Sequence, residues 1–154
     1  MKLKAITYSI PLLLLMACHP GKENTPAQNE QGESPQKKDP QTNCYRYASP
    51  TDTIALQIVH VGDSINGNLV YKLSGKDKNS GTIQGKMDGD LLVANYTFNS
   101  EGMSSVREVA FKLTSGSLIE GYGDVDVQNN VARFKDIHHL QFNDAFRLTE
   151  FPCP

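Results

Sequence analysis

The stretch of sequence that decides the fold is TIQGKMDGDLLVANYTF, residues 82–98. It contains two runs of strand-forming residues joined by Asp88–Gly89, a dipeptide typical of two-residue β-hairpin turns. Successive side chains of a strand point to opposite faces, so alternate residues share one face. In the second run the residues of one face are apolar or aromatic: Leu92, Ala94, Tyr96 and Phe98. The stretch therefore predicts an antiparallel hairpin with one buried face.

The same two-residue periodicity extends in both directions from this hairpin. The expected strands are residues 52–61, 65–73, 82–87, 91–98, 106–113, 118–123, 131–136 and 146–151, with a short strand or loop at 140–142. Turns or loops are expected at 75–81, 99–105 and 124–130, and no long segment has helical spacing with caps. Glycines inside strand patterns, at positions 67, 85, 121 and 123, are expected at bends or close backbone approaches.

About eight short strands joined by tight turns predict an all-β domain. Sequential hairpins, and chain ends that must meet, favour a small antiparallel up-and-down barrel, with a β-sandwich as the alternative. Closure into a barrel removes the exposed strand edges that promote aggregation. A barrel of this size encloses either a packed core or one small ligand.

The start of the chain has the three-part organisation of a secretory signal. Lys2 and Lys4 precede an apolar run of about 13 residues, which is too short for a permanent membrane span of about 20. The run ends in Leu15–Met16–Ala17–Cys18, which resembles the lipobox of bacterial lipoproteins, although Met is less usual at its position. The resemblance implies that residues 1–17 are removed and that acyl chains on Cys18 anchor the protein stably in a membrane. An ordinary secretory signal with an incidental cysteine is the alternative.

A polar segment separates Cys18 from the domain. Residues 19–43 are rich in Pro, Gln, Asn, Glu and Lys and contain no large apolar residue, so residues 18–43 are expected to form a disordered linker. A flexible linker of about 25 residues reaches roughly 25–30 Å. Removing residues 1–17 would change the formal net charge from −2 to −4, because Lys2 and Lys4 leave without an acidic residue. With no basic stripe in the sequence, a nucleic-acid partner is not expected.

The folded part is then residues 44–154, one domain of about 110 residues, with Cys44 and Cys153 near its two ends. Export places them in an oxidising compartment, and lipid occupies Cys18, so these two remain to pair. We predict a Cys44–Cys153 disulfide. Two free thiols are the alternative, as is a metal pair, although two ligands without nearby His partners make a poor metal site.

Several features together resemble one family. They are the lipobox, the polar linker, a cysteine at each end of the domain, and the runs GTIQG (81–85), DLL (90–92), YTFNSEG (96–102) and REVAFK (107–112). This combination is similar to small lipoproteins of Bacteroidota with a calycin-like β-barrel. The resemblance covers nearly the whole chain and implies an envelope location and a barrel. It implies no activity and no cofactor.

Arg107 is the main candidate site residue. It shares a strand face with Val109 and Phe111, which would place it inside the mouth of the barrel, where a lone charge is costly. Glu101, or Glu120 with its neighbour Tyr122, is expected to lie near it. The group is either a clamp for an anionic or carboxylate ligand or an ion pair that plugs the barrel end, and the plug is favoured.

Two other polar segments have ordinary explanations. His138–His139 with Asp136 and Asp144 suggests a weak metal site, but a polar loop is the favoured explanation. The acidic segment 124–130 suggests oxygen ligands for Ca²⁺, but it lacks the Gly and closing Glu of an EF-hand loop. No metal is therefore expected.

Asp77, Asp88 and Asp90 lie near hairpin turns, which is the wrong place for a catalytic carboxylate pair. The sequence contains no hydrolase, metalloprotease or phosphate-loop motif, and an enzyme is not expected.

These observations favour a non-catalytic, membrane-anchored envelope lipoprotein that binds a small apolar or amphipathic ligand, or a protein partner. The aromatic residues expected to face the barrel interior support a ligand: Tyr71, Tyr96, Phe98, Phe111 and Tyr122. The alternative is a structural or inhibitor-like envelope protein with a packed barrel that acts through its outer surface. His19 after the lipidated cysteine, rather than Asp, favours the outer membrane by the enterobacterial sorting pattern. The face of that membrane, periplasmic or external, stays open.

Overall fold

The computed structural model describes residues 40–100 and 102–154. The expected signal peptide, Cys18 and most of the linker lie outside the described residues, as does Glu101. The first strand begins at Thr42, so the domain starts slightly earlier than residue 44. No helix in the described part of the chain is long and apolar enough to cross a membrane.

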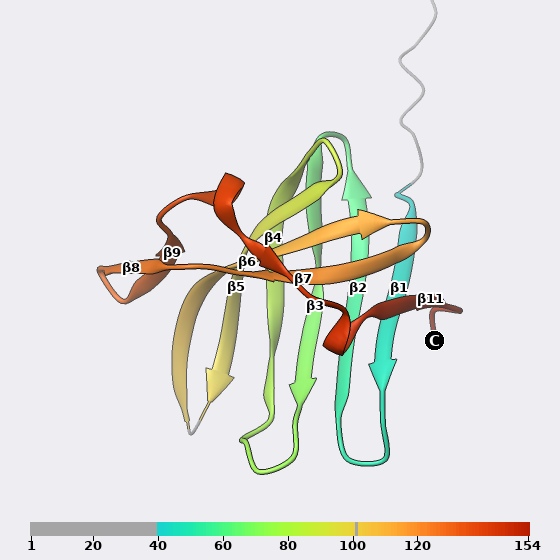
Figure 1. Cartoon of the computed structure of the whole chain (residues 1–154), viewed down its shortest axis with the longest axis horizontal. Helices are drawn as coiled ribbons and strands as arrows, with labels where there is room; N and C mark the ends of the chain where they lie inside the picture. Colours follow the sequence, from blue (N-terminus) through green and yellow to red (C-terminus); the bar gives the residue numbers. More distant parts are fainter. Residues whose placement is uncertain (1–39, 101) are drawn as a thin grey trace, which may run out of the picture. The chain divides into compact units, whose positions relative to one another are not determined.

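Eight antiparallel strands close into a barrel (Figure 1). They are β1 (Thr42–Ala48), β2 (Thr53–Val61), β3 (Ser64–Lys72), β4 (Asn79–Asp88), β5 (Leu91–Ser100), β6 (Met103–Thr114), β7 (Ser117–Tyr122) and β11 (Leu148–Phe151). Strands β1 to β7 pair with their neighbours in chain order. The last strand, β11, lies between β7 and β1 and closes the ring. The predicted barrel is confirmed, and the sandwich alternative is wrong.

The core forms because alternate residues of each strand point into the barrel. In β2 this face carries Ile54, Leu56 and Ile58, all buried. Leu56 lies directly between its register partners, Tyr45 of β1 and Leu69 of β3, so apolar layers cross the strands. Burial of such layers is the dominant favourable contribution to folding.

Two glycines inside strands lie where the backbone of the neighbouring strand leaves no space for a side chain. A Cβ added at Gly67 would collide with the Gln57 carbonyl oxygen, and one added at Gly85 would collide with the Val93 carbonyl oxygen. Both positions confirm the predicted close approach of backbone to backbone. Gly121 and Gly123 are instead crowded by the side chains of a later segment.

The predicted count of eight barrel strands is right, but its membership differs. Residues 42–48 form β1, a barrel strand that the alternation from Asp52 onward did not include. The expected strand at 131–136 is β9 (Val131–Phe134), which lies outside the barrel and pairs in parallel with the start of β6. The expected loop at 99–105 is a tight turn between β5 and β6.

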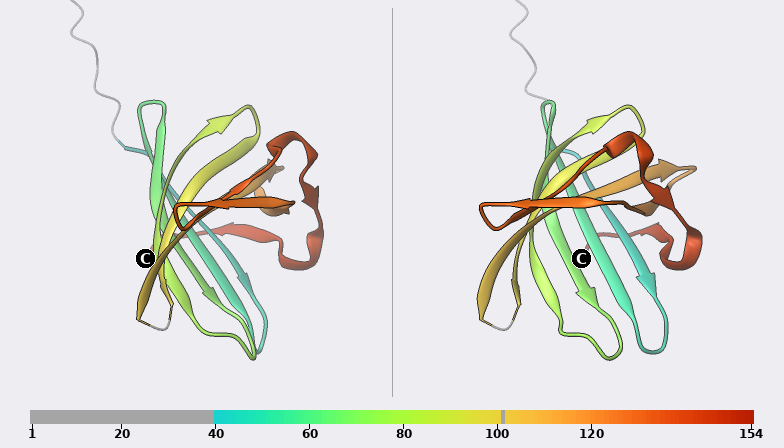
Figure 2. Two further views of the ribbon diagram at one scale, coloured as in Figure 1. Left: turned by 90° about the vertical axis from the view of Figure 1, so that its left-hand side faces the viewer. Right: turned by 60° about the vertical axis from the view of Figure 1, so that its left-hand side comes forward.

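The expected loop at 124–130 is also wrong, because Val125–Gln128 form β8, paired with β9. Asn129 and Asn130 both have positive φ, as a type I′ hairpin turn requires. The chain then passes through the short helix η1 (Ile137–His139), β10 (Gln141–Phe142) and η2 (Asp144–Phe146) before β11. In Figure 2 this red segment runs along one side of the barrel.

The predicted Cys44–Cys153 disulfide is present and joins the first and last strand regions, with Cα atoms 5.3 Å apart. All described strand pairings lie between Thr42 and Phe151, and the described residues belong to one compact unit. A fragment of residues 40–154 therefore contains its own core, its closing strand and its cross-link. We expect it to fold without the preceding residues.

Candidate functional site

One end of the barrel holds a pocket of about 510 Å³. Its lining comes from the end of β3, the β3–β4 turn and the first residue of β4, from β6 and β7 in the barrel wall, and from η2 with its N-cap Asn143. The side chains are a mixture of aromatic, aliphatic and charged groups. This volume is within the range of small-molecule sites, roughly 300–1,000 Å³.

Arg107 lies in this pocket, on the inward face of β6, as the sequence predicts. Its guanidinium carbon lies 5.1 Å from the ring centroid of Tyr71, 5.7 Å from that of Tyr96 and 5.6 Å from that of Phe98. These distances are typical of cation–π contacts. Tyr96 and Phe98 also stack on each other, at 4.7 Å between centroids. The guanidinium therefore covers the aromatic end of the core.

Glu120 reaches the same pocket from β7 and is 6% exposed. The Tyr71 hydroxyl donates to Oε1 at 2.7 Å, and the Tyr122 hydroxyl donates to Oε2 at 3.0 Å. Burial raises the pKa of the Glu120 carboxyl, although the two hydroxyl donors and the Arg107 charge act in the opposite direction. Burial of the Tyr71 hydroxyl, together with the Glu120 charge, raises the pKa of Tyr71 well above its usual value.

The structure brings Arg107, Glu120 and Tyr122 together, but Arg107 and Glu120 make no direct ion pair. No Arg107 nitrogen lies within 4.0 Å of a Glu120 oxygen. The charges interact through space only, and each Glu120 oxygen is already hydrogen-bonded to a tyrosine. In the described part of the chain, a simple Arg107–Glu120 plug is therefore not formed.

Two polar atoms in the pocket lack partners. Among residues 40–100 and 102–154, the buried side-chain atoms without a hydrogen bond are Arg107 Nε and Asn79 Oδ1. Both residues line this one pocket. A buried polar atom without a partner costs about 1–3 kcal/mol, so native proteins contain few. Arg107 therefore keeps an unused donor and Asn79 an unused acceptor. Neither atom is exposed to solvent, so a ligand in the pocket reaches them only after a side-chain rotation.

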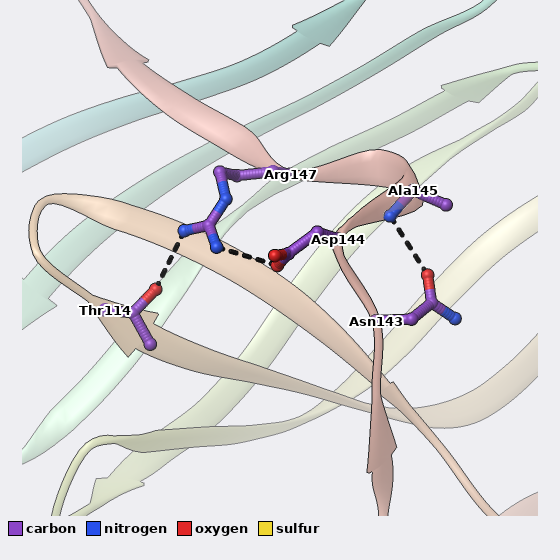
Figure 3. A network of polar contacts seen from close by, with 5 residues as sticks. All are labelled: Thr114, Asn143, Asp144, Ala145 and Arg147. Carbon is purple, nitrogen blue, oxygen red and sulfur yellow. Dashed lines mark hydrogen bonds and ion pairs between the residues drawn. The ribbon is translucent and has the colours of Figure 1, made fainter.

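The η2 wall of the pocket is held by several contacts (Figure 3). Asn143 Oδ1 accepts from the backbone N–H of Ala145 at 3.1 Å and caps the short helix. Arg147 donates to Asp144 at 2.7 Å and to the Thr114 hydroxyl at 3.2 Å, which ties η2 to the end of β6. Phe146 packs edge-on against Tyr47 of β1, with centroids 5.2 Å apart. These contacts hold η2 against β6 and β1.

Behind the pocket, the barrel interior is filled. Three of the aromatics expected to face inward, Tyr71, Tyr96 and Phe111, are at most 5% exposed, and the Tyr96 hydroxyl donates to the Leu69 carbonyl at 3.0 Å. Tyr122 is different: it is 44% exposed and reaches inward only with its hydroxyl. The core beside the pocket is therefore occupied by side chains.

The structure gives no support to the two weaker metal-site hypotheses. His139 Nδ1 lies 2.7 Å from Asp136 on the exposed helix η1, and Asp126 pairs with Lys135 at 3.8 Å across the β8–β9 hairpin. Within the described ranges, no group of three or more His, Cys, Asp or Glu side chains is placed to hold a metal ion.

Some pocket residues were not predicted. Asn79 falls in a stretch with the composition of a polar turn, and nothing in the sequence distinguishes it from its neighbours. Asn143 and Phe146 reach the pocket only because the chain returns across the barrel end through η2. Tyr71 was expected to face inward, and alternation alone gave no indication of its contact with Glu120.

The fold and the pocket define a closed, eight-stranded antiparallel barrel with a partly polar binding pocket at its mouth. No family model matches this chain, and no match to it was found among the curated proteins or the solved structures.

Proposed function

We propose that this chain is a non-catalytic lipoprotein of the bacterial cell envelope, anchored through acyl chains on Cys18, and that its barrel mouth binds a small amphipathic ligand. The observation that carries the binding role is the pocket of about 510 Å³, in whose lining Arg107 and Asn79 each have a polar atom without a hydrogen bond. Apolar surface from Leu73 and Phe146 in the same lining suits a ligand with one polar and one apolar end. The lipobox-like sequence supports the anchor.

A second candidate function is a structural or inhibitor-like protein that acts through its outer surface. The filled interior behind the pocket, with Tyr96 and Phe111 fully buried, favours it. This function needs no ligand. The apolar residues exposed on the outside, such as Val127 at 69%, would then provide contacts for a protein partner.

Native mass spectrometry separates the two functions. The fragment 40–154 is incubated with a lipid extract of bacterial envelopes, and its mass is recorded beside that of an Arg107→Gln variant. The proposal expects a discrete added mass on the wild type that is reduced in the variant. A wild-type fragment that stays free of ligand across extracts would favour the outer-surface function.

A further inference from the structure

The polar groups of the pocket differ in whether their hydrogen-bonding atoms are already paired. Both oxygens of Glu120 already accept hydrogen bonds from tyrosine hydroxyls. Arg107 makes no hydrogen bond or ion pair with any described residue; its guanidinium lies over three aromatic rings, and the Glu120 carboxylate is beyond ion-pair distance. A ligand therefore gains most by presenting an acceptor, and preferably a negative charge, to the guanidinium.

We propose that the mouth pocket binds an organic carboxylate with a neighbouring hydroxyl or amino group: the carboxylate accepts from Arg107, and the neighbouring group donates to Asn79. This inference rests on the proposed binding function and names its ligand class. A planar carboxylate matches the fork of a guanidinium, which donates two parallel hydrogen bonds. The apolar remainder of the ligand lies against Leu73 and Phe146.

The charges around the pocket favour a single negative charge over two. Its ionisable lining groups are Lys76 and Asp77 at the rim, and Arg107, Glu120 and the tyrosines inside. Lys76 and Asp77 offset each other, which leaves Arg107 as the attraction and buried Glu120 as the repulsion. A phosphate dianion would double the attraction to Arg107 and the repulsion from Glu120 alike. Its larger desolvation cost would then have no second cation inside the pocket to offset it. The carboxylate is therefore the better match.

Calorimetric titration of the fragment 40–154 tests the ligand class with four probes that each contain a linear chain of eight carbons. They are 2-hydroxyoctanoate, octanoate, octan-1-ol and octyl phosphate. We expect 2-hydroxyoctanoate to bind most tightly, octanoate more weakly, and octan-1-ol at least about tenfold more weakly than octanoate, because it makes no charge-assisted hydrogen bond. This comparison needs no variant, so it stands even if a substitution unfolds the barrel.

Two variants locate the contacts. Arg107→Gln should weaken both carboxylates by about tenfold to a hundredfold and leave octan-1-ol unchanged. Asn79→Ala should bring 2-hydroxyoctanoate down to the affinity of octanoate and leave octanoate unchanged. Arg46→Gln is the matched control, because Arg46 also lies over an aromatic ring, that of Phe151 at 4.8 Å, but does not line the pocket.

The outcomes separate this inference from the proposed function. If octan-1-ol binds as tightly as octanoate, or if octyl phosphate binds more tightly than both carboxylates, the carboxylate inference is overturned and the binding function survives. Unchanged carboxylate affinity in Arg107→Gln also overturns it. If none of the four probes binds, the inference fails, and the mass-spectrometric result with envelope lipids then decides the binding function separately.

Discussion

Removing the disulfide is the perturbation whose magnitude follows most directly from the fold. Cys44 and Cys153 are 109 residues apart in sequence, so the cross-link restricts almost the whole unfolded domain. In the chain-entropy model, closing a loop of about 110 residues lowers the unfolded-state entropy by about 16 cal/mol/K, which is about 4.8 kcal/mol at 25 °C. The disulfide also reinforces closure of the barrel, because β11 pairs with β7 at only two positions.

The double variant Cys44→Ala/Cys153→Ala should therefore lose about 4–5 kcal/mol of unfolding free energy, a large fraction of the 5–15 kcal/mol of a typical domain. Urea unfolding of the fragment 40–154 measures it. The control is the wild-type fragment in reductant, which loses the cross-link but keeps the buried Cys44 side chain in place. The unfolding free energy should fall by similar amounts in the double variant and in the reduced wild type. A loss below about 1 kcal/mol in both would refute the reasoning, because it would mean that the link hardly restricts the unfolded chain.

Three further predictions follow from single residues. Gly85→Ala should cost about 1–3 kcal/mol in urea unfolding, because its Cβ would collide with the Val93 carbonyl; a change under about 0.5 kcal/mol would contradict that crowding. Glu120→Gln tests the raised pKa of the Glu120 carboxyl. Below the usual pKa of 4.5 the wild-type carboxyl is protonated in both the folded and the unfolded state, and the protein keeps its full stability. As the pH rises through the raised pKa, the unfolding free energy of the wild type relative to the variant should fall, by at most about 1.4 kcal/mol per pH unit. A difference that is flat, or that rises with pH, would argue for an ordinary carboxylate. Cys18→Ala in the full chain should move the protein from the membrane to the soluble fraction of cells and abolish its labelling by a fatty acid; continued labelling would exclude the proposed anchor.

The barrel was predictable because alternation along each strand is a local signal that burial enforces. A one-residue shift would turn the apolar face of β2 outward, so its pattern is strict. The pattern is weaker in β1, where the neighbours Cys44 and Tyr45 are both buried, and this strand was missed. In β8 alternation is present, but the strand lies outside the barrel with its side chains exposed, and its composition alone predicts an acidic loop. The Asn129–Asn130 pair is the signal that identifies the turn of this hairpin.

The site was predictable only where one strand carries it. The face of β6 that holds Phe111 placed Arg107 inside the barrel, and the alternation of β7 placed Glu120 there too. The contact of the Tyr71 hydroxyl with Glu120 depends on the spatial meeting of β3 and β7, and Asn79 joins the same pocket from the start of β4. Strands β3 and β7 are far apart in sequence, and no local pattern encodes their distance. The contact between Tyr71 and Glu120, 49 residues apart, is the example.

The most direct test of the account is a crystal structure of the fragment 40–154 grown with 2-hydroxyoctanoate. The account predicts the carboxylate within hydrogen-bond distance of Arg107, the hydroxyl at Asn79, and the alkyl chain against Phe146. A probe bound elsewhere, or one reversed in the pocket with its carboxylate away from Arg107, would contradict it.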